Sequence, residues 1–334
     1  MTPLKVAVIG VGHMGRHHAR LYSEMPNVEL VAVVDTNELV ARDTAKKLNT
    51  NYYTNYSDII GKINAANVAV PTSMHYPIAQ HLLEEGIHLL VEKPVTNNLL
   101  EAEHLISIAD AKSLIFQIGH TERFNPAVLE LDTLINKPIF IEAHRMGHPT
   151  TRNLDIGVVL ELMIHDINII LSIVNSTIVQ INAVGLSVYS QHEDIAQAQL
   201  LFENGCIASI SASRVSAEKI RSLEITQDDA FLHLDYIDQN IILRKQVSSR
   251  YVFDQPRAMY QREFMVQQPL ISKDEPLRLE LQHFIECVRT GAAPLVSGRD
   301  GKDALAVALQ IRNEMVMTCS KENKLARDLL VMEK

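Results

Sequence analysis

The residues of this chain best suited to chemistry include an acid and an imidazole that interrupt an apolar run. The stretch DIGVVLELMIHDINIILSIV at 155–174 carries Glu161 and His165 four residues apart. On a helix, this spacing puts both side chains on one face, one turn apart. A carboxylate beside an imidazole can orient the ring and raise its basicity, which suits a general base. The same pattern also fits a core histidine satisfied by a buried carboxylate, and spacing alone does not separate the two.

Lys93 is a second candidate for proton transfer. It directly follows the apolar run IHLLVE, within the sequence EKP. A lysine at the end of a buried strand is partly desolvated, which disfavours its charged form and suits proton transfer. The competing interpretation is a surface lysine in an ion pair with Glu92.

The start of the chain carries a dinucleotide-binding pattern. A continuous apolar run at 4–9 precedes Gly10, Gly12 and Gly15 in the spacing GxGxxG, and a helix pattern follows. The first glycine makes a tight turn, the second admits the pyrophosphate, and the third lets helix and strand pack closely. The start of the helix then offers N–H donors to the anion.

The residue at the end of the second strand run indicates which cofactor binds. Asp35 ends the run VELVAVVD, where a carboxylate takes the ribose hydroxyls of the adenosine. A carboxylate repels a 2′-phosphate, and the neighbouring Thr36 and Asn37 add no positive charge. NAD is therefore favoured over NADP.

Strand runs and amphipathic helix patterns alternate through the first third of the chain. The alternation predicts a doubly wound parallel sheet, a Rossmann domain at 1–122. Ligands of such sheets bind at the carboxyl ends of the strands. The residues expected to bind NAD there are Gly10, Gly12, His13, Met14, Gly15, Asp35, Pro71, Thr72, His75, Glu92, Lys93 and Gly119. His75 and the next candidate, His120, could also be ordinary loop histidines.

From about Pro138 the pattern changes to period-two alternation with short turns between runs. It predicts an α+β domain at 123–334 with a large, open, mostly antiparallel sheet that buries one face. Helices are predicted at 156–174 (with Asp155 as N-cap), 277–290 and 301–320, and the C-terminal helix can pack back on the first domain. An apolar open sheet face usually acquires a partner, so a homo-oligomer, a dimer or tetramer, is expected.

Composition excludes several other classes of function. The 334-residue chain has a net charge of −9, which disfavours nucleic acid or an anionic membrane as a partner. Its three cysteines, Cys206, Cys287 and Cys319, lack metal-type spacing, so reduced thiols in a cytoplasmic protein and no metal are expected. No signal-peptide pattern is present. The run at 155–174 is long enough for a membrane span, but its charged residues favour a buried helix.

Together these motifs resemble the glucose–fructose oxidoreductase, inositol dehydrogenase and MocA family over essentially the whole chain. The matching features are GxGxxG with Asp35, EKP at 92–94, and Gly157, Glu161 and His165 in the spacing Gly-x₃-acid-x₃-His. The segments GHTERFNPAV, DIGVVLELMIHDINI, ASRVSAEKIR and EPLRLELQHFIECVRTG are similar to the subgroup containing UDP-N-acetylglucosamine 3-dehydrogenases.

The resemblance implies a reaction. NAD would oxidise the 3-hydroxyl of a UDP-N-acetylhexosamine, most simply UDP-N-acetylglucosamine, to a 3-keto sugar for lipid A-type amino sugars. Lys93 and His165 would be the catalytic pair, with His165 the first choice as base and the reverse order open. Glu161 stands where the family usually has Asp, and its extra methylene shifts the carboxylate by about one bond length, a scale to which catalytic geometry is sensitive.

A diphosphate substrate also needs cations, and guanidinium groups bind phosphate bidentately. The residues expected to bind the substrate are His120, Arg123, Asn125, Arg152 and Arg214, with Lys219 and Arg221 as further candidates. Two alternatives remain: a dehydrogenase of another alcohol, such as an inositol or a free sugar, and a cofactor-binding regulator without turnover. Retention of Lys93 and His165 favours an enzyme.

Overall fold

The chain divides into two compact units in the computed structural model, which describes residues 2–149, 156–254 and 257–319. Unit 1 comprises Met1–Phe124 and Asp274–Ala306, and unit 2 comprises Asn125–Lys273 and Val307–Lys334. The units divide after residue 124, close to the boundary expected after residue 122, and the chain re-enters unit 1 after residue 273; the return expected from the sequence was that of the C-terminal helix. The return is explained by helix α7 (Pro276–Thr290), whose buried Leu277, Leu281 and Phe284 share one face and join the unit 1 core.

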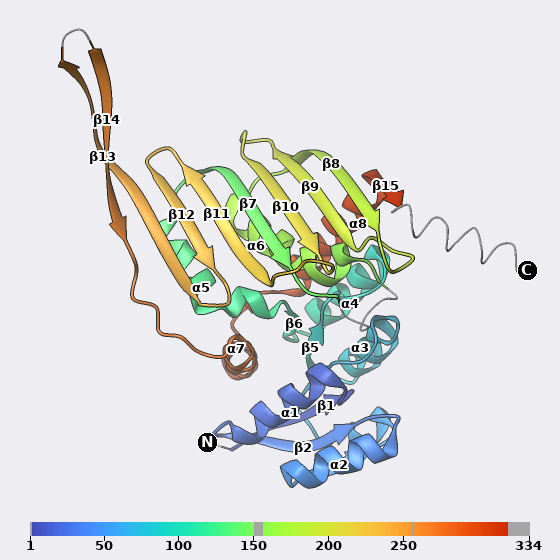
Figure 1. Ribbon diagram of the computed structural model, residues 1–334. Helices are drawn as coiled ribbons and strands as arrows, with labels where there is room; N and C mark the ends of the chain where they lie inside the picture. Colours follow the sequence, from blue (N-terminus) through green and yellow to red (C-terminus); the bar gives the residue numbers. More distant parts are fainter. Residues whose placement is uncertain (1, 150–155, 255–256, 320–334) are drawn as a thin grey trace, which may run out of the picture. The chain divides into compact units, whose positions relative to one another are not determined.

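Unit 1 is built on a six-stranded parallel sheet in the order β3-β2-β1-β4-β5-β6 (Figure 1). Its strands are β1 (Leu4–Ile9), β2 (Val28–Val34), β3 (Asn51–Tyr53), β4 (Ala65–Val68), β5 (His88–Glu92) and β6 (Phe116–Gly119). Its helices are α1 (His13–Glu24), α2 (Glu38–Leu48), α3 (His75–Glu84), α4 (Leu99–Ala111) and α7, with short 3₁₀ turns η1 (Tyr56–Ile59), η2 (Thr72–Met74) and η3 (Thr121–Phe124). This strand order confirms the predicted doubly wound fold.

Local sequence signals set the ends of these elements. Asn37 caps α2 by accepting a hydrogen bond from Val40 N, and Asn98 caps α4 in the same way from Glu101 N. Gly291 ends α7 in the left-handed conformation, at φ 75°. β4 stops at Val68, so the segment that follows is a loop at the carboxyl edge of the sheet.

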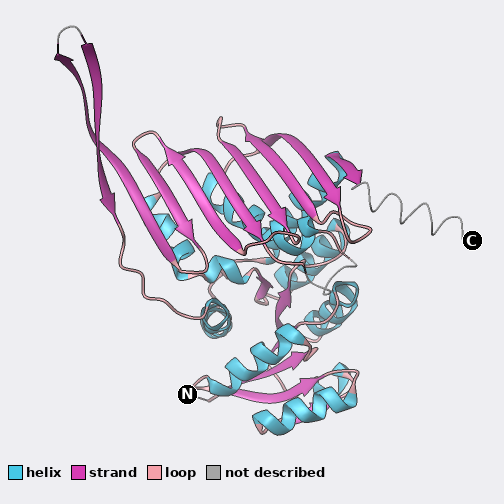
Figure 2. Cartoon of the chain, in the orientation of Figure 1, coloured by secondary structure: helices cyan, strands magenta, loops and turns pink. Residues whose placement is uncertain are grey.

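Unit 2 is built on a mixed, nine-stranded sheet in the order β14-β13-β12-β11-β7-β10-β9-β8-β15. The strands are labelled in Figure 1 and drawn in magenta in Figure 2. Its strands are β7 (Pro138–Met146), β8 (Ile178–Ser187), β9 (Ile195–Phe202), β10 (Ile207–Ser213), β11 (Ile220–Gln227), β12 (Ala230–Asp235), β13 (Asn240–Asp254), β14 (Arg257–Gln267) and β15 (Met315–Cys319). Only the β10–β7 and β15–β8 pairs among these named strands are parallel, so the mostly antiparallel prediction is confirmed.

The end of the described chain differs from the prediction. Helix α8 (Gly298–Glu314) gives way to β15, so the helix expected over 301–320 is too long. β15 pairs with β8 and forms the edge of the sheet, and a Cβ on Gly185 of β8 would lie 2.2 Å from the sulfur of Met315. The missing side chain at Gly185 therefore makes room for the added strand, a pairing between distant segments that local periodicity does not reveal.

Helices α5 (Pro126–Leu134) and α6 (Ile164–Val174) lie along one face of this sheet (Figure 1). A π-helical turn, η4 (Val159–Met163), precedes α6, which corrects the regular helix expected over 156–174; the predicted N-cap Asp155 lies outside the described residues. Alternate residues of β7 such as Ile141 and Ala143 are buried on the helix-covered face. The opposite face is mixed in polarity, with Glu142 paired in register with Glu224.

Candidate active site

The turn between β1 and α1 has the shape that a dinucleotide requires. Gly10 has φ +82°, and a Cβ there would lie 2.5 Å from the carbonyl oxygen of Ala69. A Cβ on Gly15 would lie 1.8 Å from Gly10 O, so only glycine allows this approach of helix and turn. By contrast, no described atom comes within 4 Å of a Cβ on Gly12. The middle glycine therefore faces open space, as the pyrophosphate position does in this motif.

Helix α1 starts at this turn with its N-terminus available to an anion. His13 and Met14 are its first residues, and Gly12 is its N-cap. Within the described part of the chain, no side chain caps this end and its first turn contains no acidic residue. The guanidinium Nε of Arg16 donates to Val11 O at 3.0 Å and so braces the turn. The N–H groups and the helix dipole can thus serve a phosphate.

Asp35 is held in place by the backbone at the end of β2. Its Oδ2 accepts from Val11 N at 3.0 Å, and its Oδ1 accepts from Asn37 N at 2.9 Å. It borders a cavity of about 410 Å³ lined by Ile9, Gly10, Gly12, Val34, Asp35, Thr36, Thr54, Tyr56, Ala69, Val70, Pro71, Met74 and Ile78. The glycine turn, the available helix terminus and the fixed carboxylate fit NAD, with Asp35 at the ribose.

His75 has a structural role that the sequence did not reveal. The side chain is buried, with Nδ1 2.9 Å from Pro94 O and Nε2 2.9 Å from Val70 O. Burial lowers the pKa of the imidazole, against the opposing effect of these carbonyls. His75 therefore ties the loop after β4 to the EKP segment after β5, and its contact with NAD stays a prediction. Thr72, three residues earlier in η2, is half-buried at the same edge of the sheet.

The EKP segment fixes Lys93 at the carboxyl end of β5. Lys93 is half-buried, and a cis peptide bond joins it to Pro94. The Glu92 carboxylate lies 3.0 Å from His18 Nε2 through Oε1 and accepts from Lys93 N at 3.3 Å through Oε2. A Cβ on Gly119, opposite Glu92 in the sheet, would lie 3.1 Å from that carboxylate. Glu92 is thus turned into the unit, towards His18 of α1.

His120 follows β6 and is buried. Burial, with added repulsion from the charges of Lys93 and Arg123, lowers the pKa of His120 to about 3. The ring is therefore neutral at physiological pH. It can form hydrogen bonds with a ligand, but it cannot offer the ligand a positive charge. Arg123 is half-buried in η3 of the same unit.

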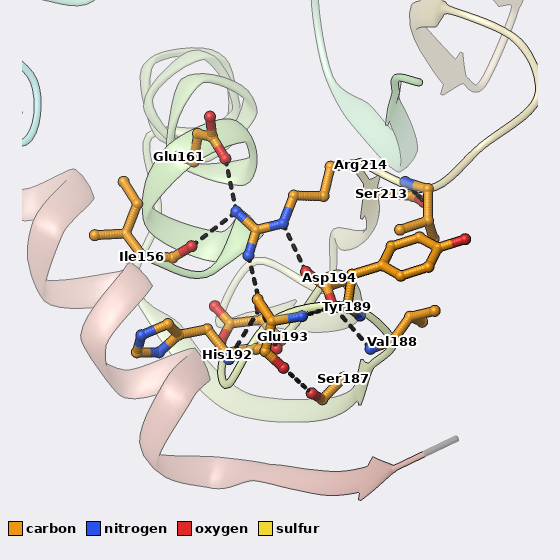
Figure 3. Close-up of polar contacts among 12 residues, drawn as sticks. Ile156, Glu161, Ser187, Val188, Tyr189, His192, Glu193, Asp194, Ser213 and Arg214 are labelled. Atoms are coloured by element: carbon orange, nitrogen blue, oxygen red, sulfur yellow. Dashed lines mark hydrogen bonds and ion pairs between the residues drawn. The ribbon is translucent and has the colours of Figure 1, made fainter. Parts of the chain in front are cut away.

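In unit 2, Glu161 lies in a buried ion-pair network centred on Arg214 (Figure 3). Arg214 Nη1 donates to Glu161 Oε2 at 3.1 Å and to Ile156 O at 2.8 Å. Its Nε donates to Asp194 Oδ1 at 2.7 Å, and its Nη2 donates to Ser190 Oγ at 2.9 Å. Arg214 was expected to bind a diphosphate. Its side chain is instead 4% exposed and its guanidinium is bonded to two carboxylates, so these contacts do not support that expectation.

Asp194 anchors the network to the loop between β8 and β9. Its Oδ2 accepts from the backbone N–H groups of Val188, Tyr189 and Ser190 (Figure 3). Burial opposes ionisation, but these N–H groups and Arg214 outweigh it and hold the pKa of Asp194 well below its usual range. The carboxylate is therefore anionic and complements the guanidinium.

Gly157 makes room for a second acid of the same loop. A Cβ on Gly157 would lie 1.9 Å from Glu193 Oε1. The carboxylate accepts from Val159 N at 3.2 Å, and Glu193 O accepts from Val158 N at 3.0 Å. Glu193 thus caps the helix that carries Glu161 and His165, and the glycine of the Gly-x₃-acid-x₃-His pattern is needed for this approach.

His165 is half-buried in the first turn of α6, beside an acid that secures the helix. Asp166 is fully buried and accepts two hydrogen bonds from Arg145 of β7, from Nε at 2.7 Å and from Nη2 at 2.8 Å. Asp166 is therefore committed to Arg145 of β7. This pair of hydrogen bonds between guanidinium and carboxylate fixes α6 on the sheet, and with it the position of His165.

The remaining predicted substrate residues have different outcomes. Asn125 is buried: its Oδ1 accepts from Ala127 N as the cap of α5, and its Nδ2 donates to Tyr236 O at 2.9 Å. These bonds assign it a structural role, and contact with substrate stays a prediction. Arg152 lies outside the described residues.

Sequence reasoning missed buried residues that hold the site together, namely His18, Asn67, Arg145, Glu193 and Asp194. Two signals were available: Asn67 interrupts an apolar strand run, and Glu193 with Asp194 precedes another. A buried polar residue must find a partner, so each interruption indicated a network. The hydrogen-bond partners of these residues could not be predicted, because the partners lie far away in the sequence.

The fold and the cofactor half of the site define an NAD-binding oxidoreductase. The chain belongs to the GFO/IDH/MocA family: residues 4–120 match its oxidoreductase, NAD-binding Rossmann-fold model, and residues 138–233 match its C-terminal domain model.

Relatives and solved structures extend over nearly the whole chain. The UDP-N-acetylglucosamine 3-dehydrogenase of Acidithiobacillus ferrooxidans is 30% identical over 93% of this chain and 97% of its own length. The scyllo-inositol 2-dehydrogenase (NAD(+)) of Bacillus subtilis is 27% identical over 93% of each chain. A structure of the Acidithiobacillus enzyme matches with TM-score 0.86 at 29% identity, over 94% of this chain and 98% of that one.

In the part of the chain that the structure describes, every helix is too short or too polar to cross a bilayer.

Proposed function

We propose that this protein oxidises the 3-hydroxyl of a UDP-N-acetylhexosamine, in the first instance UDP-N-acetylglucosamine, to the 3-keto sugar with NAD as acceptor. The observation that carries the proposal is the likeness, over nearly the full length of both chains, to a UDP-N-acetylglucosamine 3-dehydrogenase. Retention of Lys93 and His165 supports catalysis over a cofactor-binding role alone.

The reaction needs a hydride acceptor, a proton acceptor and a fixed sugar. Bound NAD supplies the hydride acceptor. We assign His165 to accept the hydroxyl proton and Lys93 to polarise the same oxygen. The anchoring of α6 through Asp166 and Arg145 supports this assignment, because a general base must be held rigidly. Glu161 is assigned to orient His165, in the position where the family usually has Asp.

Arg123 is the preferred cation for the substrate diphosphate, because Arg214 is bonded to two carboxylates. His120, neutral and close enough to Lys93 to sense its charge, is assigned to the sugar hydroxyls. Arg152 remains a candidate from the sequence. A 3-keto product is the substrate type that a sugar aminotransferase consumes, which suits amino-sugar synthesis for lipid A-type glycans in the cytoplasm. The open face of the unit 2 sheet remains the proposed contact for a homodimer or homotetramer.

The test combines NAD with UDP-N-acetylglucosamine and follows NADH absorbance together with the mass of the sugar product. NADH and a product lighter by two hydrogens are expected. His165→Asn, which keeps a polar group of similar length, should abolish turnover while NAD affinity stays within about twofold of the parent. Absence of NADH and of keto product, even in a single turnover, contradicts the substrate assignment. Full activity in the His165→Asn variant contradicts the role of His165.

A second candidate function is oxidation of a polyol. It is favoured by similarity to the inositol dehydrogenase of Bacillus subtilis over 93% of each chain. Parallel assays with scyllo-inositol, myo-inositol and free N-acetylglucosamine separate the two. Under the main proposal kcat/KM for the UDP sugar exceeds that for each polyol by at least about a hundredfold, because binding of the distant diphosphate helps to position the hydroxyl.

A further inference from the structure

A chain of four buried polar side chains crosses unit 1 and ends beside Lys93. Tyr22 Oη donates to Asn67 Oδ1 at 2.7 Å, and Asn67 Nδ2 lies 2.7 Å from His18 Nδ1. His18 Nε2 lies 3.0 Å from Glu92 Oε1. His18, Tyr22 and Asn67 have no exposed surface, and Glu92 is 9% exposed. Such a chain across a core has a high desolvation cost unless every contact is made.

The donors and acceptors in this chain run in one direction. An amide nitrogen can only donate, so Asn67 Nδ2 donates to His18 Nδ1 and makes it an acceptor. The proton of the neutral His18 ring is then on Nε2, where it is donated to Glu92. Burial of Tyr22 raises the pKa of its hydroxyl well above the usual value, so the first donor keeps its proton. The sequence Tyr22→Asn67→His18→Glu92 therefore delivers a hydrogen bond to an ionised carboxylate.

A second carboxyl, Glu280 of α7, is in the opposite state. It is fully buried, accepts from Thr121 Oγ1 at 2.9 Å through Oε2, and its Oε1 has no hydrogen-bond partner among the described residues. Burial and the charge of Glu92 raise the pKa of Glu280 well above its usual value. Burial also acts against ionisation of Glu92, but the hydrogen bond from His18 and the charge of Lys93 lower the pKa of Glu92 overall. Glu92 therefore carries the charge and Glu280 the proton.

Several titratable groups act on Glu92 from the surrounding elements. They are His18 from α1, His75 from α3 and Lys93 after β5, and Glu280 from α7 responds to the charge of Glu92 in turn. His120, after β6, senses the charges of Lys93 and Arg123. The interaction between Glu92 and Lys93 is mutual: the lysine charge favours the carboxylate, and the carboxylate favours the ammonium.

We propose that His18, held by Asn67 and Tyr22, is a positioning residue that keeps Glu92 fixed and ionised, so that Glu92 maintains Lys93 as an ammonium ion. The inference rests on the proposed function for the role of Lys93 on substrate. It assigns a task to a histidine within GHMGRHHAR that lies outside the dinucleotide motif. It also separates the two members of the EKP pair: Lys93 acts on the substrate, and Glu92 acts on Lys93.

The test measures the titration of Lys93 directly, without substrate. Lysines of the full chain are ¹³C-dimethylated, and the Lys93 resonance is assigned by its loss in Lys93→Arg. Glu92→Gln keeps an oxygen acceptor for His18 and removes the charge. We expect it to lower the pKa of Lys93 by about 1 to 3 units, the size of the effect of one close charge. Glu280→Gln is the matched control, because it replaces a neutral buried acid by a neutral amide, and it should leave the pKa of Lys93 within about 0.3 units.

The pH–rate profile tests the same shift during turnover. Whether Lys93 acts as ammonium or as base, the limb that it controls should move to lower pH in Glu92→Gln and stay in place in Glu280→Gln. His18→Leu should lower kcat by about ten- to a hundredfold with little change in the KM for NAD, since a misplaced charge impairs chemistry more than binding. His18→Gln, whose amide nitrogen can replace Nε2–H, should restore most of the kcat.

Two results would overturn the proposal: equal pKa values of Lys93 in the parent and in Glu92→Gln, or an equal shift in both glutamine variants. The NMR result does not depend on the substrate. A shifted Lys93 in a protein inert towards UDP-N-acetylglucosamine supports the positioning network and rejects the proposed substrate. Turnover of that sugar with an unmoved Lys93 supports the function and rejects the network.

Discussion

Arg214 and Glu161 form an ion pair, in which Nη1 lies 3.1 Å from Oε2. Glu161 belongs to the helical segment that also carries His165. The same guanidinium reaches Asp194 at 2.7 Å, so one side chain links the helix to the loop between β8 and β9. The acid of the Gly-x₃-acid-x₃-His pattern is therefore tied to the scaffold of unit 2.

Arg214→Lys should destabilise the protein by about 3 kcal/mol or more, since a lysine cannot reproduce the planar fork and leaves buried carboxylates short of donors. Urea unfolding measures the loss. Arg123→Lys is the matched change at the residue assigned to the diphosphate, and it should instead raise the KM for the nucleotide sugar at unchanged stability. The opposite outcome, an Arg214→Lys protein of parent stability with a raised substrate KM, would instead support Arg214 as the residue that binds the substrate diphosphate.

Gly157→Ala should destabilise the protein by about 1 to 3 kcal/mol and lower kcat, because the new methyl would lie 1.9 Å from the Glu193 carboxylate and displace the cap of the helix that carries Glu161 and His165. Urea unfolding and steady-state kinetics measure both effects. Gly147→Ala provides the control, since its Cβ would meet Ser213 O at an ordinary 3.9 Å. Parent-like behaviour of both variants would contradict the tight fit.

Arg145→Met or Asp166→Leu should each cost about 3 to 5 kcal/mol, because either change leaves the partner charge buried and uncompensated. The double variant should cost much less than the sum, since replacement of a whole buried pair by apolar groups is often close to neutral. A double-mutant cycle in urea gives the coupling energy. Additive losses would show that the two residues act independently.

His120 should make the protein sensitive to acid. Its pKa is about 3 in the folded state against an ordinary 6.5, so only the unfolded chain binds its proton between these values. Its contribution to stability is complete above pH 6.5 and is lost as the pH falls towards 3, with a slope of about 1.4 kcal/mol per pH unit. His120→Gln should remove this slope from urea unfolding measured at several pH values. His148→Gln, a change at an exposed histidine, should keep the slope. An unchanged slope in His120→Gln would refute the assignment of the acid sensitivity to His120.

Much of the fold could be read from local patterns. The GxGxxG turn, the apolar runs of β1 and β2, and the period-two strands of unit 2 each act through neighbouring residues, so their structure follows from short-range sterics and burial. The same is true of the position of Lys93 after β5. The sequence allowed the C-terminal helix to pack back on the first domain but did not single out α7, because a helix with one apolar face can be buried against any sheet, and the pattern does not name the partner.

The sequence by itself determined a Rossmann unit with an NAD site, an α+β unit, and the residue types available for catalysis. Only the tertiary structure decided what the buried charges do. Arg214 pairs with an acid 53 residues away, and His18 bonds an acid 74 residues away. A cation on a surface and a cation in a core look alike in a sequence. What distinguishes them is desolvation, because a buried charge requires a partner that the fold alone brings within reach.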